Sequence, residues 1–433
     1  MFNPWIHQID VAYSRRGHLR GRRDFLRNLA VGSLAAGTLS FGDLLRLEAA
    51  EMKRNNMACI LLWMQGGPSQ FETFTPLVGH ANGGETKAIA TNVPGIEIAE
   101  NLPEIAQVMD RLAVIRSMTS REGNHQRATS LLHTGYLPTP TVRYPTFGSH
   151  VAHQLAPDDV ELPSFVRVGN VRSGEAGGLL GVEYDPFVVQ NAERPPRNSE
   201  PTTSDDRYRR RLALMERLEQ GYARRGATRE VEDHQKLYRK ASRMILSEDM
   251  RAFDLTRESE AVRAAYGEGQ FAAGCLLARR LIESGVTFVE VVASGWDTHA
   301  DNFRRTRELC TGIDRPTAAL LRDLEDRGRL DNTLVIWMGE FGRTPKINGR
   351  GGRDHFPRAF NVALAGAGVQ GGRIVGKVSP NGGQVAERPV SVPDLFRTFC
   401  EALTINPDHE DMSPIGRPIT IADEGEAVAE LFA

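Results

Sequence analysis

The sequence predicts an α/β fold in which a central, mostly parallel sheet is flanked by helices. Patterns of buried strands recur along the chain, and the segments between them are long enough for crossover helices. An unbroken apolar run covers residues 58–64 and ends at Gly66, Gly67 and Pro68, which is typical of a buried parallel strand that opens into a loop. We expect this run to form the first core strand.

Further apolar runs are expected to form other strands of the same sheet, at 112–115, 286–292, 333–338 and 361–364. The segment 195–281 differs, because it is rich in Arg and Glu and places Leu and Met at helical spacing. It therefore predicts a helical insertion within a domain that covers 51–433. Acidic residues interleave with the basic ones there, so we expect solvated helix faces rather than a basic binding surface.

Composition limits the classes of function. The chain has 433 residues, of which 40% are hydrophobic, so it can fill the core of one large α/β domain. Its 53 Lys and Arg residues nearly cancel its 55 Asp and Glu residues, which gives no electrostatic reason to expect a nucleic-acid partner. The four cysteines lack metal-binding spacing and are predicted to be buried thiols: Cys59, Cys275, Cys310 and Cys400.

The N-terminal region resembles an export signal. Arg22 and Arg23 are followed by Phe25 and by a mildly apolar run of small residues over 29–41, which is typical of a twin-arginine signal. The run is too short and too rich in Gly, Ala and Ser for a membrane anchor. We expect 1–50 to be this signal region and the protein to be periplasmic or extracellular, with membrane attachment only through an uncleaved signal.

Polar residues gather just after the predicted strands, where open parallel sheets bind their ligands. A carboxylate and an imidazole follow the strand at 286–292, an acid and an arginine follow the strand at 333–338, and a second Asp and His pair comes shortly afterwards. These are ligand types for Zn, Mn, Ca or Mg. The predicted metal-site residues are Asp297, His299, Glu340, Asp354 and His355, with Arg343 beside them.

Each of these residues also has a structural interpretation on its own. Asp297 and His299 can cap a helix, and Glu340 can pair with Arg343. The argument for a site is that such clusters follow consecutive strands.

A further cluster lies at 121–127, before a segment that is expected to form a helix. Arg127 beside the start of that helix would suit a phosphate or sulfate group, while a simple capped helix start explains it equally well. His125 is a candidate metal ligand or general acid and base.

Three segments resemble the alkaline phosphatase and sulfatase superfamily, at 124–138, 332–340 and 392–398. More closely, residues 22–430 resemble a family of exported bacterial proteins labelled domain of unknown function number fifteen hundred and one. Motifs that carry this resemblance are 66–74, 295–299, 339–345 and 352–355. The resemblance implies an alkaline-phosphatase-like sheet and a divalent metal, but no established reaction.

The chain also departs from the superfamily pattern. Sulfatases carry a Cys or Ser four residues before the arginine, and here that place falls on Gly123 or His125, so a formylglycine-type sulfatase is excluded. The first strand ends in Gln65 rather than an acidic ligand, although Glu72 could reach back to a metal. A complete two-metal phosphatase site is therefore not expected.

We derive two hypotheses of function from these features. The first is an exported metal-dependent hydrolase that acts on a small anionic ester or a sulfated or phosphorylated glycan. In it the metal activates water, Arg127 and Arg343 steady the anion, and His125 is a metal ligand or a general acid and base. The second is a non-catalytic exported binding or surface-structure protein that keeps the sheet. The first hypothesis requires the predicted ligands to converge at the carboxyl ends of the strands.

Overall fold

The computed structural model describes residues 57–432 apart from 158–159, 172–175, 198 and 200–202. Its main sheet has eight strands in the order β12-β4-β11-β8-β1-β7-β5-β6. Their bounds are β1 Ala58–Gln65, β4 Ala113–Met118, β5 Phe165–Val168, β6 Phe187–Val189, β7 Phe288–Ser294, β8 Thr333–Met338, β11 Phe360–Ala365 and β12 Arg373–Val375. Only β11 runs antiparallel to its neighbours within this sheet. The predicted α/β fold and the five predicted strands are confirmed.

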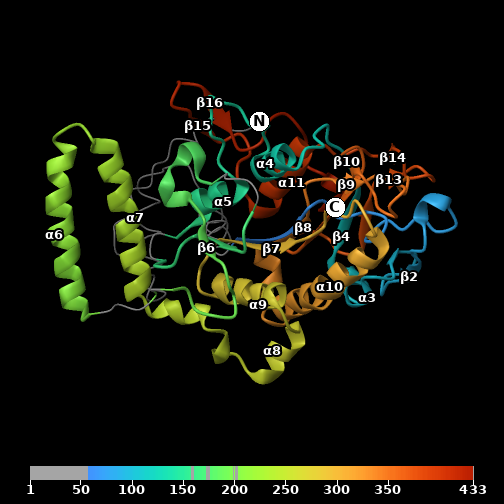
Figure 1. The fold of residues 1–433 in the computed structure, drawn as a ribbon, viewed down its shortest axis with the longest axis horizontal. Helices are drawn as coiled ribbons and strands as arrows, with labels where there is room; N and C mark the ends of the chain where they lie inside the picture. The colour runs from blue at the N-terminus through green and yellow to red at the C-terminus, as the bar shows by residue number, and fades with distance from the viewer. Residues whose placement is uncertain (1–56, 158–159, 172–175, 198, 200–202, 433) are drawn as a thin grey trace, which may run out of the picture. The chain divides into compact units, whose positions relative to one another are not determined.

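Helices cover both faces of the sheet (Figure 1). One face carries α3 (Pro103–Ala106), α9 (Gln270–Glu283) and α10 (Asn302–Asp326), and the other carries α4 (His125–Thr134), α5 (Phe147–Leu155) and α11 (Val392–Leu403). In β1, Ile60 and Leu62 join the core on the first face, whereas Leu61 and Trp63 join the core on the second. Burial on both faces explains why β1 is apolar without interruption.

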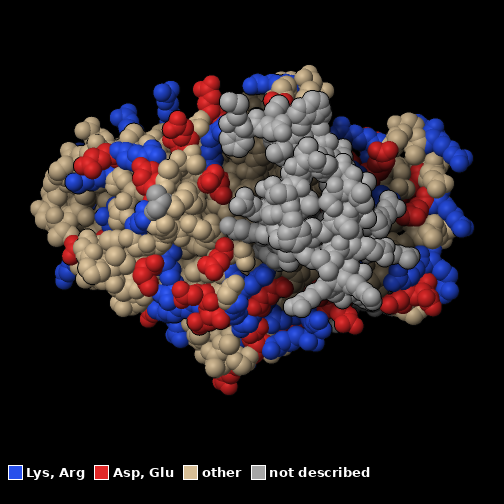
Figure 2. Space-filling model, turned by 180° about the vertical axis from the view of Figure 1, so that it is seen from behind, with Lys and Arg blue, Asp and Glu red and all other residues tan. Residues whose placement is uncertain are grey.

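The polar block between β6 and β7 is helical. It contains α6 (Asp205–Ala223), α7 (Thr228–Leu246), η6 (Glu248–Phe253), η7 (Leu255–Arg257) and α8 (Glu260–Tyr266). No residue of α6 is buried, whereas α9, at the end of the block, packs against β7 as a crossover helix. Figure 2 shows Lys and Arg interspersed with Asp and Glu over the described part of one face, which therefore presents no broad basic surface.

Short hairpins and turns complete the described part of the chain. The hairpins are β2 (Ala88–Ala90) with β3 (Glu97–Ala99), β9 (Gly342–Arg343) with β10 (His355–Phe356), β13 (Lys377–Val378) with β14 (Val385–Glu387), and β15 (Glu410–Met412) with β16 (Pro418–Thr420). The remaining 3-10 turns are η2 (Ala81–Gly83), η3 (Met109–Arg111), η4 (Gly178–Leu180), η5 (Val182–Tyr184), η8 (Leu330–Asn332) and η9 (Ala429–Leu431).

Several sequence expectations concern features outside the sheet. All four cysteines are buried and unpaired, and burial raises the pKa of the Cys59 thiol, as expected for structural rather than reactive cysteines. Within the described residues, no helix combines the length and the hydrophobicity that crossing a membrane requires. The predicted twin-arginine signal lies outside the described residues.

Candidate functional site

The candidate site lies where three neighbouring parallel strands end. Strand β1 lies between β8 and β7, so the loops after these strands meet at one edge of the sheet. The β7 loop carries Asp297, and the β8 loop carries Glu340. The loop after β1 joins them, because the backbone N–H of Gly66 donates to Oε1 of Glu340 at 3.0 Å and to Oε2 at 3.1 Å.

Three imidazoles surround one oxygen of Asp297. Its Oδ1 lies 3.3 Å from Nε2 of His125, 3.1 Å from Nε2 of His299 and 3.3 Å from Nε2 of His355. The Nε2 atoms of His299 and His355 are themselves 2.9 Å apart. The histidines come from the first turn of α4, the β7 loop and β10, so they are brought together only by the tertiary fold.

The opposite nitrogen of each imidazole is held by an oxygen. Nδ1 of His125 lies 2.6 Å from Oε1 of Glu340, and Nδ1 of His299 lies 2.9 Å from Oδ1 of Asp354. Nδ1 of His355 lies 2.8 Å from the carbonyl oxygen of Gly123. With a cation bound, the acceptor at each Nδ1 atom would hold the proton of a neutral imidazole there and leave the Nε2 lone pairs free to bind the cation.

Arg343 holds the carboxylate of Asp297 from the buried side of the site. Its guanidinium is buried and donates to Oδ1 of Asp297 at 2.7 Å and, through Nε, to the carbonyl of Gly67 at 2.8 Å. Burial alone would raise the pKa of Asp297, but the hydrogen bond and charge of Arg343 outweigh it, so this pKa lies below its usual range. Burial, together with the charges of Arg343 and His125, lowers the pKa of His355. Both shifts favour metal-binding forms, a carboxylate and a neutral imidazole.

The approach of the β1 loop to the site requires glycine. Gly66 has φ of 121°, and a Cβ atom on it would lie 2.5 Å from the backbone nitrogen of Asp297. A side chain there would therefore push the β1 and β7 loops apart. This close contact explains Gly66, whereas a Cβ atom on Gly67 would lie 2.7 Å from the ring of Phe341.

Two predicted site residues lie outside this cluster. Glu72 is fully buried and forms an ion pair with Arg353, with Oε1 2.8 Å from NH2. Arg127 is half exposed, and its Nε lies 2.6 Å from Oε2 of Glu122. Both partners lie in the clusters at 121–127 and 352–355, but the sequence did not predict these pairings.

Sequence reasoning also missed groups that support the site. Asn348 donates from Nδ2 to the carbonyl of His299 at 3.1 Å and to Oδ1 of Asp354 at 3.2 Å. The carbonyl of Gly123 carries no side-chain signal at all. The signal for Asn348 was its position between two motifs, 339–345 and 352–355.

The donor set fits a divalent cation. Donor atoms bound tetrahedrally at about 2.0 Å lie about 3.3 Å from one another, close to the 3.1 to 3.3 Å that separate Oδ1 of Asp297 from each Nε2 atom. Ligand atoms of His125, Asp297 and His355 all lie within 4.8 Å of one another. Nε2 of His125 is buried and, although it lies 3.3 Å from Oδ1 of Asp297, it makes no hydrogen bond to the described residues, as expected of an atom positioned for a metal.

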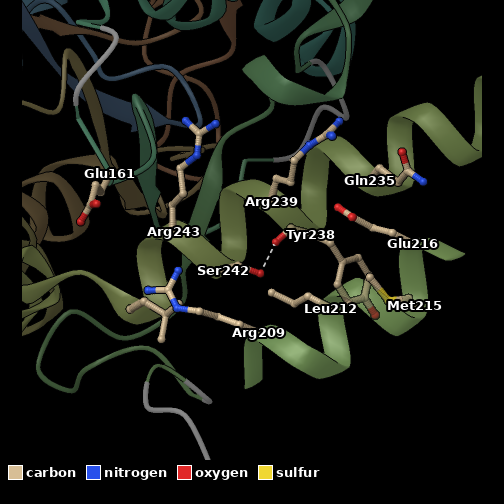
Figure 3. A pocket seen from close by; sticks show the side chains of 11 residues that line it. Glu161, Arg209, Leu212, Met215, Glu216, Gln235, Tyr238, Arg239, Ser242 and Arg243 are labelled. Carbon is tan, nitrogen blue, oxygen red and sulfur yellow. Dashed lines mark hydrogen bonds between the residues drawn. The ribbon is translucent and has the colours of Figure 1, made fainter. Parts of the chain in front are cut away.

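A cavity of about 250 Å³ lies elsewhere, between α6 and α7 (Figure 3). Figure 3 shows that its labelled side chains come from both helices, with Glu161 added from the segment before β5. Arginines and glutamates both line it, so it has no single charge preference. We call His125, Asp297, His299 and His355 the histidine cluster; none of these residues lines this cavity.

Comparison with solved structures finds remote likenesses. One is a sulfatase, PsFucS1, from Pseudoalteromonas sp., with 14% identity over 84% of this chain and 70% of that chain, and a TM-score of 0.39. Another is the phosphonate monoester hydrolase of Agrobacterium radiobacter, with 12% identity over 87% of this chain and 77% of that chain, and a TM-score of 0.39. At these TM-scores we base no argument on either structure.

Sequence comparison is more informative. No curated protein matches this chain. The family described as Protein of unknown function (DUF1501) matches residues 56–432, which include the whole of the described sheet and every residue of the histidine cluster. The chain therefore belongs to this family of proteins of unknown function.

Proposed function

We propose that the protein is an exported metal-dependent hydrolase of phosphate or sulfate esters. The observation that supports this most is the set of three imidazole Nε2 atoms around Oδ1 of Asp297, each with its Nδ1 atom held by an oxygen. In this proposal His125, His299, His355 and Asp297 hold the metal, while Glu340 and Asp354 orient two of the imidazoles. Such carboxylate to histidine contacts fix the ligand tautomer and raise its basicity.

A divalent cation bound there would polarise the ester and lower the pKa of a water molecule, which would act as nucleophile in place of the Cys or Ser that sulfatases carry where this chain has Gly123 or His125. The residues of this chain have the tasks of placing that cation and the substrate. Arg343 keeps Asp297 ionised from the buried side. The start of α4, where His125 is the first helical residue, directs the positive end of a helix dipole at an incoming anion.

The first test is to remove the central ligands. We expect Asp297→Ala and His355→Ala to lower metal content and to reduce turnover of aryl phosphate or aryl sulfate esters at least about 100-fold, since loss of even a supporting residue costs 10- to 100-fold. Turnover would be measured after chelation and add-back of Zn, Mn, Ca or Mg. His234→Ala is the matched control, because His234 also contacts a carboxylate, Glu219, but at the surface.

Three outcomes are distinguishable in this test. Loss of turnover together with loss of metal from this site, with the circular dichroism spectrum intact, supports the hydrolase. Metal binding without turnover of either ester class by the unaltered protein would instead favour a non-catalytic binding protein. A protein that binds no stoichiometric metal after add-back would overturn both the metal centre and the hydrolase.

A further inference from the structure

A second group of histidine and aspartate side chains lies away from the candidate site, where α5 meets the β15–β16 hairpin. Ligand atoms of His153, His409 and Asp411 all lie within 4.8 Å of one another. Nε2 of His409 is 3.7 Å from Oδ1 of Asp411, and the rings of His153 and His409 have centroids 6.1 Å apart. All three side chains are partly buried, so the group is neither an open surface cluster nor sealed from solvent.

The group contains buried polar atoms that nothing in the described chain satisfies. Nδ1 of His153 and Oδ2 of Asp411 are buried and have no hydrogen-bond partner among the described residues. Buried polar atoms in folded proteins are almost always paired, so such atoms on neighbouring side chains point to a bound species. A nitrogen lone pair and a carboxylate oxygen together would suit a cation.

The surroundings hold the group in place. The Tyr184 ring lies edge-on to His153, with centroids 4.9 Å apart, and Ser149, one turn before His153 on α5, donates its hydroxyl to the carbonyl of Tyr184 at 3.0 Å. On the other side, Asp411 is fixed by strand pairing with Ile419. Two segments of the chain that are more than 250 residues apart are therefore positioned independently, as a preformed site requires.

A further histidine, His150, lies beside the group and carries no positive charge that would repel a cation. His150 is only 2% exposed and lies one helical turn from His153 on α5. Burial, with smaller contributions from His153 and His409, lowers the pKa of His150 to about 3, so its ring is neutral. Its Nδ1 also lacks a partner among the described residues.

We propose that His153, His409 and Asp411 form a second metal site, which binds a zinc-class divalent cation with two imidazoles, one carboxylate and an open fourth position. Two nitrogen donors favour zinc over calcium or magnesium, which prefer oxygen ligands. The donor atoms lie at most 4.8 Å apart, and small side-chain rotations would bring them to the roughly 3.3 Å expected around tetrahedral zinc. The bound cation would tie the β15–β16 hairpin to α5.

The test counts zinc in a protein whose histidine cluster around Asp297 has been disabled, so that its result does not depend on the proposed hydrolase. The Asp297→Ala/His355→Ala protein would be stripped with a chelator and titrated with zinc against a chromogenic competitor. We expect about one equivalent to remain. Adding Asp411→Asn, which keeps the side-chain volume, or His409→Ala should lower the affinity for that zinc ion at least about 100-fold.

Controls separate binding at this site from unfolding and from adventitious binding. Adding His234→Ala instead, at a surface histidine that contacts Glu219, should leave the zinc equivalent unchanged. Circular dichroism and the zinc-free melting temperature must match the parent, and zinc should raise the melting temperature of the parent but not of the Asp411→Asn protein. If the zinc equivalent is missing from the parent, or survives both Asp411→Asn and His409→Ala, the proposed site is wrong.

Discussion

The buried glutamate Glu290 shows how ion pairs stabilise a charge inside this sheet. Glu290 of β7 is fully buried, with Oε2 2.7 Å from Nε of Arg167 and Oε1 3.0 Å from Nε2 of His133. Burial alone would raise the pKa of Glu290, but the charges of Arg167 and His133 outweigh it and lower the pKa to about 2. The apolar run 286–292 predicted the strand, but it gave no sign of partners on β5 and α4.

The Glu290→Gln variant should therefore lose stability in a pH-dependent way. Because the folded pKa lies below that of the unfolded chain, the ionised carboxylate stabilises the protein above about pH 4.5, and this contribution is lost as the pH falls toward 2. Removing one partner of a buried ion pair costs about 3–5 kcal/mol, so we expect a deficit of that order at pH 7 in urea unfolding.

The difference in unfolding free energy between Glu290→Gln and the parent should shrink between about pH 4.5 and pH 2. Glu387→Gln is the control, since Glu387 pairs with Lys377 at the surface and should change stability by less than about 1 kcal/mol. A deficit that is the same at pH 7 and pH 3 would show that shape, rather than charge, explains the effect.

At the scale of elements, the local hydrophobic pattern predicted where strands lie but not how they pair. Strands β1 and β8 were predictable because burial on both faces leaves an unbroken apolar run. The antiparallel direction of β11 and the two-residue strands β9 and β10 were not, since strand pairing across the chain sets them. The same limit applies to Glu72, whose partner Arg353 is 281 positions away.

The candidate site was partly predictable for the same reason. Residues that follow strand ends could be grouped from sequence, and the structure brings Asp297, His299 and His355 together. The contacts of Glu340 and Asp354 with imidazole Nδ1 atoms could not be foreseen, because they depend on side-chain directions that only the completed loops determine.

Gly66→Ala tests the contact between the β1 and β7 loops. The added methyl group would meet the backbone of Asp297, so we expect a loss of stability of about 2 kcal/mol or more and, if the metal centre is as proposed, weaker metal binding. Gly79→Ala is the matched control, because Gly79 also has a positive φ, of 77°, but has open space beside it. Equal losses in denaturant unfolding for the two variants would contradict a role of steric contact.

At the scale of the whole molecule, the histidine cluster forms only when α4, the loop after β7 and β10 have come together. The twin-arginine pathway carries folded proteins, so this route would suit a site built from distant segments. Export remains our proposal from the sequence of residues 1–50.

Replacing Arg22 and Arg23 with Lys should leave the precursor in the cytoplasm, because the receptor recognises the arginine pair. Cell fractionation with an antibody against the protein would measure this. Arg15 and Arg16 provide the control, since they form a second pair without a phenylalanine two residues later. Unchanged export of the Arg22→Lys/Arg23→Lys protein would rule out the signal.

The central place of β1 has a consequence for synthesis on the ribosome. Cys59 of β1 pairs with Phe288 of β7 and Leu334 of β8, so both neighbours of this strand are translated long after it. At roughly 5–20 residues per second, the nascent strand waits on the order of 10–50 seconds for its first partner. An apolar strand with unpaired edges is prone to associate with other chains during such a delay. We therefore expect newly made chains to depend on a holding chaperone until β7 has emerged.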